Sequence, residues 1–188
     1  MTRGTSHRTK NLTASAILAA MGVSLLFIGM MIETLDLSMA ALASFLCIFA
    51  VIELGGKYSW LIYAVTGVLS VILMPFNMAG WFYLLFFGYY PILKERFERL
   101  NKTLAWAVKL IVVNLALTAC ITLASFLFYS GNMLKALKVM LGAENWGVYA
   151  IIGMWVLVNI VFIIYDIALT RLITFYFIKI RHRFKFLK

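Results

Sequence analysis

Long apolar runs and short polar stretches alternate along the chain, giving six apolar runs in all. A helix needs about 20 apolar residues to cross the hydrocarbon core of a bilayer. None of the runs alternates apolar and polar residues as the strands of a membrane barrel do. The pattern therefore predicts an all-α, polytopic membrane protein with a bundle of six transmembrane helices, at Leu12–Ile32, Leu37–Leu54, Tyr58–Met74, Met78–Leu93, Leu104–Tyr129 and Val148–Ile173.

The chain divides into one membrane domain and two basic ends. Residues 1–11 form a basic N-terminal segment, residues 12–178 the transmembrane domain, and residues 179–188 a basic tail. The first run is about 21 residues long, whereas the apolar core of a secretory signal has roughly 7–15 residues. We therefore expect this run to be kept as a membrane span.

The basic residues predict the orientation of the spans, because short loops rich in Lys and Arg stay on the cytoplasmic side. With six spans, the outer side has only Lys135 and Lys138 as cations, together with Glu33, Asp36 and Glu144. We predict that both termini are cytoplasmic and that the protein lies in the plasma membrane of a bacterium. The other 15 of the 17 Lys and Arg residues fall on the inner side: Arg3, Arg8, Lys10, Lys57, Lys94, Arg96, Arg99, Lys102, Lys109, Arg171, Lys179, Arg181, Arg183, Lys185 and Lys188.

The composition excludes a soluble fold. The 188 residues are 64% hydrophobic and 13% charged, whereas soluble domains are roughly 45–50% apolar and about 25% charged. The net charge of +10 is explained by the topology and by attraction to anionic lipid headgroups. We therefore expect the lipid bilayer as a partner, and no nucleic acid.

Groups that carry out chemistry are scarce. His7 and His182 lie in the basic ends, while Cys47 and Cys120 lie inside spans, where cysteine packs as a small apolar residue. Metal sites need clustered His, Cys or acidic ligands, and no motif suggests a nucleophile or a phosphate loop. We predict that the protein is not an enzyme and has no catalytic residue, metal or cofactor.

Polar residues inside the membrane are costly and are the first candidates for function. Lys109 and Asp166 lie at similar depths from the inner ends of the fifth and sixth spans. We predict an intramembrane ion pair that pins these helices, rather than a proton or ion relay, because no second acidic residue continues a path outward. Asn114 and Asn159 lie deeper, and interhelical hydrogen bonds are favoured over ligand contacts.

The outer connections gather aromatic and amide side chains near one membrane boundary. Trp and Tyr commonly anchor a protein there, but aromatic walls with a few amides also line small-molecule pockets. The connection Ser130–Gly147 is long and has an amphipathic helical pattern, so it is a candidate lid. The candidate substrate-binding residues are Asn77, Trp81, Tyr83, Asn132, Glu144, Asn145, Trp146 and Tyr149.

The first span carries two overlapping pairs of small residues, Ser15 with Ala19 and Ala16 with Ala20. Small residues at this spacing let another helix approach closely. Six spans, cytoplasmic ends and the Ala16–Ala20 pair resemble the substrate-binding S component of energy-coupling factor (ECF) vitamin transporters. The likeness covers the architecture of nearly the whole chain, whereas the very short first outer connection and the aromatic fourth span depart from the family pattern.

The resemblance implies a substrate-capture subunit that binds a vitamin or another small molecule under its outer loops. Ala16 and Ala20 would then contact a transmembrane T component, and separate ATPase subunits would supply the energy. The alternative is a structural or scaffolding protein of the cell envelope or sporulation machinery, with the basic loop Lys94–Lys102 as its docking surface. A channel or ion-coupled carrier is disfavoured, since the spans contain no ladder of ionisable groups and no inverted repeat.

Overall fold

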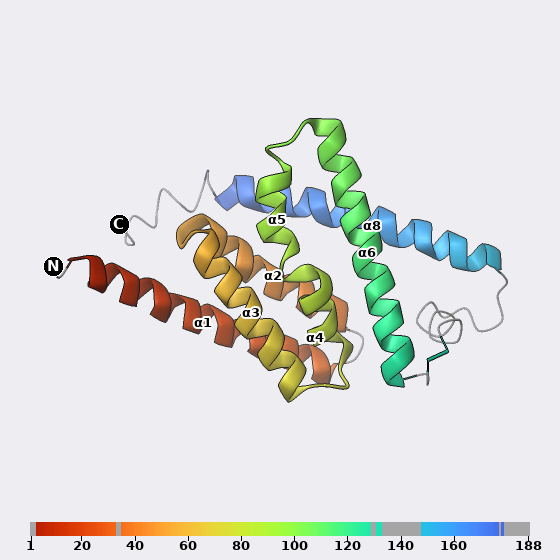
Figure 1. Ribbon diagram of the computed structural model, residues 1–188, viewed down its shortest axis with the longest axis horizontal. Helices are drawn as coiled ribbons and strands as arrows, with labels where there is room; N and C mark the ends of the chain where they lie inside the picture. The colour runs from red at the N-terminus through yellow and green to blue at the C-terminus, as the bar shows by residue number, and fades with distance from the viewer. Residues whose placement is uncertain (1–2, 33–34, 129–130, 133–147, 177, 179–188) are drawn as a thin grey trace. The chain divides into compact units, whose positions relative to one another are not determined.

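A computed structural model of the chain describes residues 3–32, 35–128, 131–132, 148–176 and 178. The described residues form helices joined by short turns, with no strand among them (Figure 1). The all-α prediction is therefore confirmed for this part of the chain. In chain order the elements are α1 (Arg3–Met31), α2 (Asp36–Glu53), α3 (Gly56–Leu73), α4 (Met78–Phe82), the π-helix η2 (Tyr83–Phe87), α5 (Tyr90–Phe97), α6 (Lys102–Phe128) and α8 (Val148–Phe175).

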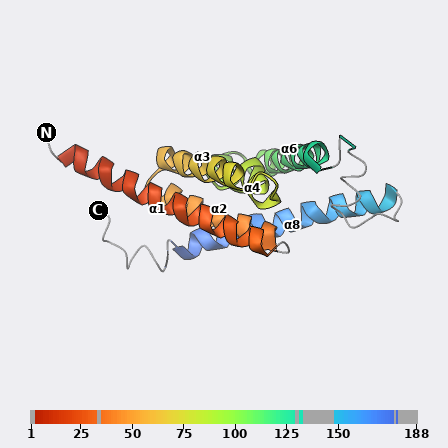
Figure 2. The ribbon, with the colours of Figure 1, turned by 90° about the horizontal axis from the view of Figure 1, so that it is seen from below.

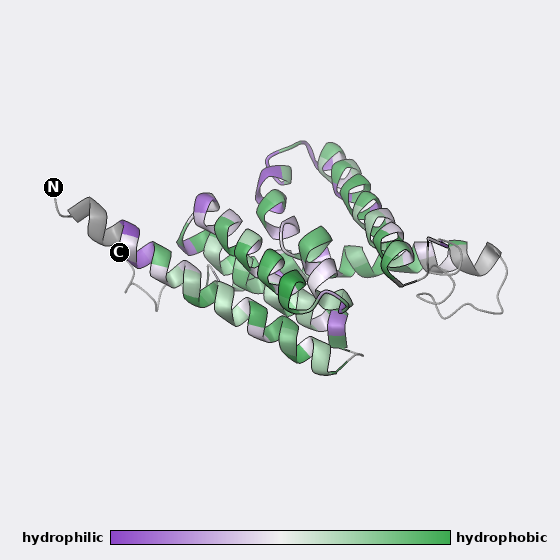
Figure 3. Ribbon diagram, turned by 60° about the horizontal axis from the view of Figure 1, so that its bottom comes forward, coloured by the Kyte–Doolittle hydropathy of each residue, from purple (hydrophilic) through white to green (hydrophobic). Residues whose placement is uncertain are grey.

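Five of the described helices contain segments long and apolar enough to cross a membrane. Large apolar side chains stay exposed along them, among them Ile72 on α3, Leu115 on α6 and Ile164 on α8. Such exposure is expected of a surface that faces lipid rather than water. Figure 3 shows hydrophobic positions along the helices and hydrophilic ones mainly near helix ends. The five segments are Arg8–Met31, Asp36–Glu53, Gly56–Leu73, Lys102–Leu127 and Trp155–Phe175.

The chain forms two compact units, an N-terminal unit (Met1–Leu100) and a C-terminal unit (Asn101–Lys188). In the N-terminal unit, α1 packs against α2 and α3 (Figure 2). The buried stripe of α1 includes Ser15, Ala19 and Gly22. A Cβ atom on Gly22 would lie only 2.9 Å from the side chain of Thr66 on α3, so the absence of a side chain permits this close packing.

The fourth span was predicted as one uninterrupted helix over Met78–Leu93, and the structure differs from this prediction. The structure divides it into α4, the π-helix η2, a turn at Gly88 and Tyr89, and α5, which continues to Phe97. We call this stretch, Met78–Phe97, the fourth run. Apolar composition is compatible with either helix type, so packing against neighbouring helices decides between them.

The ends of the five other helices can be compared with the predicted spans; four helices agree with the prediction and one differs. The ends of α2, α3, α6 and α8 lie within two residues of their predicted positions, whereas α1 begins at Arg3 instead of Leu12. The hydrophobic pattern detects only the part of a helix that lipid covers, so it cannot show where a helix continues into water. The tight turn between α2 and α3 uses Gly55, whose φ of 87° is costly for other residues.

Candidate functional site

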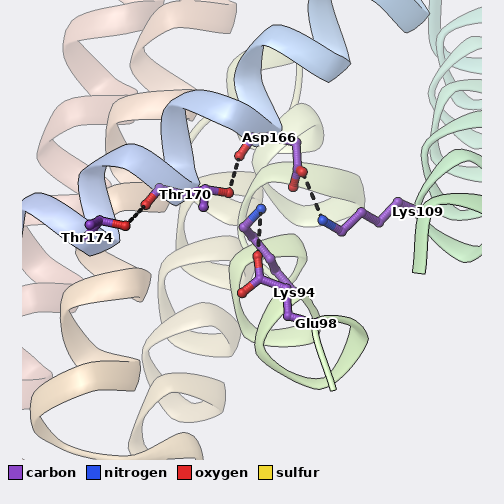
Figure 4. A network of polar contacts seen from close by, with 6 residues as sticks. All are labelled: Lys94, Glu98, Lys109, Asp166, Thr170 and Thr174. Carbon is purple, nitrogen blue, oxygen red and sulfur yellow. Dashed lines mark hydrogen bonds and ion pairs between the residues drawn. The ribbon is translucent and has the colours of Figure 1, made fainter. Parts of the chain in front are cut away.

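The predicted ion pair between α6 and α8 is present in the C-terminal unit. Lys109 Nζ lies 2.9 Å from Asp166 Oδ2, and the two residues are 5% and 3% exposed. The ammonium group also lies 5.2 Å from the centre of the Trp106 ring, a favourable cation–π distance. The hydroxyl of Thr170 donates to the backbone carbonyl of Asp166 (Figure 4). The two charges therefore compensate one another where water cannot solvate them.

A cluster of amides forms a second connection between α6 and α8. Asn114 Nδ2 donates to Asn159 Oδ1 at 3.0 Å, and Trp155 Nε1 donates to Asn114 Oδ1 at 2.7 Å. The amides also donate to the backbone carbonyls of Leu110 and Trp155, and Asn159 Nδ2 lies 3.4 Å from Asn114 Oδ1. These bonds use all four amide hydrogens and both acceptor positions of Asn114. The cluster is better suited to joining helices than to holding a ligand.

The two polar connections share one antiparallel register. Lys109 and Asn114 are five residues apart on α6, and their partners Asp166 and Asn159 are seven apart in the opposite order on α8. Trp155 was not a candidate in the sequence analysis, although its position four residues before Asn159 places both on one helix face. This four-residue spacing was the sequence signal that could have identified Trp155 as a member of the cluster.

In the N-terminal unit, two predicted binding residues stabilise the turn between α3 and α4. Asn77 Oδ1 accepts from the Ala79 amide at 2.8 Å, which caps α4, and its Nδ2 donates to the carboxylate of Asp36 at 3.3 Å. Trp81 Nε1 donates to the carbonyl of Pro75 at 2.9 Å. Asp36, which the sequence analysis treated only as a loop charge, begins α2 and connects it to this turn.

Tyr83, which the sequence suggested as a binding residue near a membrane boundary, has a buried side chain. Its side chain is fully buried, and its hydroxyl lies 3.0 Å from Cys47 Sγ on α2. Next to it, the hydroxyl of Tyr63 donates to the Leu84 carbonyl at 2.8 Å. The side chain of Tyr83 therefore fills the core between α2 and the π-helix.

The remaining candidates belong to the C-terminal unit. Asn132 follows α6 in the C-terminal unit and is exposed. Tyr149 lies in the first turn of α8, but its side chain is outside the description. Most of the candidate lid Ser130–Gly147 also lies outside the described residues, including Glu144, Asn145 and Trp146.

The small residues of α1 face two directions. Ser15 and Ala19 are buried within the N-terminal unit, where the hydroxyl of Thr66 on α3 donates to the Ala19 carbonyl at 3.4 Å. Ala16 and Ala20 are exposed. One small-residue pair is therefore used inside the unit, and the other is available on its surface.

Two charges of α5 pair with residues that follow its C-terminal end. Lys94 Nζ lies 3.1 Å from a carboxylate oxygen of Glu98 (Figure 4), and Arg99 lies 2.8 Å from Glu95. Both are i,i+4 pairs, and Lys94 is only 1% exposed. A substantial part of the charge in the loop Lys94–Lys102 is thus neutralised locally.

The described residues provide no set of three His, Cys, Asp or Glu side chains that could hold a metal ion. Their two cysteines, Cys47 and Cys120, are free and buried. Comparison of the chain with protein-family models, curated proteins and solved structures found no match.

Proposed function

We propose that this chain is the substrate-capture subunit of a small-molecule uptake transporter, similar to the S components of ECF transporters. It spans a bacterial cytoplasmic membrane six times with both termini inside. It binds a small molecule, such as a vitamin, at its outer side. A transmembrane T component and separate ATPase subunits supply the energy.

The exposed pair Ala16 and Ala20 on α1 is the observation that carries the proposal. In lipid, helices associate through close packing of small residues, since burial of apolar surface provides little extra driving force there. The neighbouring face of α1 already uses Ser15 and Ala19 for packing within the N-terminal unit. The surface pair thus offers a contact for a helix of another subunit.

The proposed count of six spans includes the fourth run. Five helices are long and apolar enough to cross a membrane by themselves. The apolar part of the fourth run, Met78–Leu93, contains 16 residues, which as a continuous helix would extend about 24 Å, less than the roughly 30 Å of the hydrocarbon core. An even number of spans keeps the basic termini on the same side as the basic loop after α5.

In the proposal, the ligand enters on the side of the turn around Asn77 and Trp81. A capture subunit must change conformation or orientation to release its ligand inward, and a partner drives this change only through different contacts with the two states. In this proposal α1 provides those partner contacts, while the turn and the following connection lie at the ligand side.

Native mass spectrometry of the tagged chain, extracted gently from membranes of its own host, tests both parts of the proposal. We expect a complex with T-component and ATPase subunits and, on the chain itself, the added mass of a small molecule. The double variant Ala16→Trp/Ala20→Trp should lose the complex and keep the small molecule, because bulky side chains prevent close helix approach.

The matched control is Ala64→Trp, a small-to-large change at an exposed position of α3. It should keep both the complex and the small molecule. Retention of the complex by the double variant would exclude α1 as the coupling surface. A wild-type chain with neither subunits nor a small molecule would contradict the capture function itself.

A further inference from the structure

Helix α3 and the fourth run approach one another closely at three glycines. A Cβ atom on Gly88 would lie 2.5 Å from the Tyr63 ring, and one on Gly67 would lie 2.5 Å from Leu84. Further out, a Cβ atom on Gly80 would lie 3.3 Å from the hydroxyl oxygen of Ser70. The contacts are antiparallel, because residue numbers fall along α3 as they rise along the fourth run.

The two partners use different numbers of residues between the same contacts. From Ser70 to Tyr63, α3 moves seven residues, or about two helical turns, whereas the fourth run moves eight from Gly80 to Gly88. Eight residues of an ordinary α-helix would turn Gly88 about 80° away from the direction of Gly80. The π-helix absorbs this extra residue and keeps both glycines against α3.

The Gly88 amide marks the extra residue. It donates to the carbonyl of Tyr83, five residues earlier, at 2.8 Å. In an α-helix it would instead donate to Leu84, four residues earlier. In the structure the Leu84 carbonyl accepts the hydroxyl of Tyr63 at 2.8 Å. The Tyr63 hydroxyl therefore replaces the Gly88 amide as the donor to the Leu84 carbonyl, because in the π-helix that amide bonds to Tyr83.

From these contacts we infer that the fourth run has two registers against α3 and that Tyr63 selects between them. In the observed register, Gly88 bonds to Tyr83 and Tyr63 bonds to Leu84. In the second register, Gly88 bonds to Leu84, and Phe87 takes the place of Gly88 opposite Tyr63. The rings of Tyr63 and Tyr83, which a Cβ atom on Gly88 would approach to 2.5 Å and 2.8 Å, must then both turn aside.

The exchange of registers turns α5 relative to α4 by about 100°, the rotation of one residue. The buried face of α5, which includes Tyr90 and Lys94, rotates with it. A change in the middle of the N-terminal unit is thereby transmitted to its inner end. This device belongs to the N-terminal unit itself and operates whatever the protein binds.

One selectively labelled NMR signal reports the register directly. Gly88 is the single glycine that follows a phenylalanine in the sequence, so ¹³C-carbonyl Phe and ¹⁵N-Gly labelling of the full chain isolates its amide. Two exchanging signals, or an exchange contribution to relaxation, are expected for the wild type. A single signal without exchange would overturn the inference.

Deletion of Leu85 removes the extra residue while keeping Phe87 before Gly88. The bond from Gly88 to Tyr83 then spans four residues, and Gly80 and Gly88 share one face of an ordinary α-helix. We expect a folded protein with one Gly88 signal and no exchange. Exchange that persists unchanged in this variant would refute the π-helix as its source.

Tyr63→Phe tests the hydroxyl separately and decides the matter if the deletion variant does not fold. Loss of one hydrogen bond should raise the population of the second register about fivefold. The control Tyr58→Phe makes the same chemical change on the same helix and should leave the Gly88 signals unaltered. Equal spectra for the two variants would count against a selecting role for Tyr63.

Discussion

Lys109 of α6 and Asp166 of α8 are 57 positions apart in the sequence, yet their charged groups lie 2.9 Å apart within the C-terminal unit. Both side chains are buried. Each charge therefore depends on the other for compensation, and the pair sets the height at which the two apolar helices meet. Five residues further along α6, the amide of Asn114 repeats this connection with Asn159.

Removing one charge of this pair should be more harmful than removing both. Lys109→Met or Asp166→Leu removes one member of a buried pair whose charged atoms lie 2.9 Å apart, which costs about 3–5 kcal/mol, whereas the double variant should approach wild-type stability. Reversible unfolding in mixed micelles gives the four free energies of the cycle. Additive losses would show that the two residues do not act as a pair.

The amide cluster should show a graded loss of stability. Asn114 makes the most bonds of its three members, so Asn114→Ala should cost more than Trp155→Phe, which loses one bond. Interhelical hydrogen bonds in membranes are worth about 0.6–1.7 kcal/mol each. The control Thr122→Val loses a bond within α6 alone, and the same unfolding measurement should show a smaller effect. The reverse order of stability loss, with Thr122→Val the most and Asn114→Ala the least destabilising variant, would show that the cluster has no structural role.

Asn77 combines two tasks that substitutions can separate. Asn77→Ser keeps an oxygen to cap α4 but loses the amide that donates to Asp36, whereas Asn77→Ala loses both. The alanine variant should lose about 0.5–2 kcal/mol for the cap in addition to the bond to Asp36. The free energies of unfolding should therefore fall in the order Asn, Ser, Ala. Equal values for serine and alanine would mean that the cap contributes nothing.

In the observed register, Gly88 should tolerate no side chain. Gly88→Ala puts a methyl group into the Tyr63 and Tyr83 rings, and such overpacking costs about 1–3 kcal/mol. Gly153 on α8 has open space around it, so Gly153→Ala should be neutral or slightly stabilising through helix propensity. Thermal unfolding of both variants makes the comparison, and a tolerated Gly88→Ala would contradict the close approach.

The pairing of polar residues between α6 and α8 could be predicted from the sequence by counting residues along each span. Depth along a membrane helix increases by a constant rise per residue, so Lys109 and Asp166 fall at similar distances from the inner ends of their spans. The same count places Asn114 near Asn159. Trp155 was missed because an indole hydrogen bond needs a particular side-chain direction, which the residue spacing alone does not give.

The environment of Tyr83 did not follow from the sequence. A tyrosine five residues after the outer turn is compatible with a boundary anchor or a ligand contact, and the aromatic pattern of the fourth run has no single polar face. Cys47, on another helix, accounts for its buried position. Contacts of this kind join residues far apart in the sequence, so no local pattern contains them.

The sequence by itself determined the helical class and the approximate ends of α2, α3, α6 and α8, because backbone hydrogen bonds in an apolar medium must close within each segment. The tertiary structure alone decided the register of the fourth run. Ser70 and Tyr63 on α3 are seven residues apart, and their glycine partners are eight apart. Only contact between the two helices reveals this mismatch, which the π-helix between Gly80 and Gly88 accommodates.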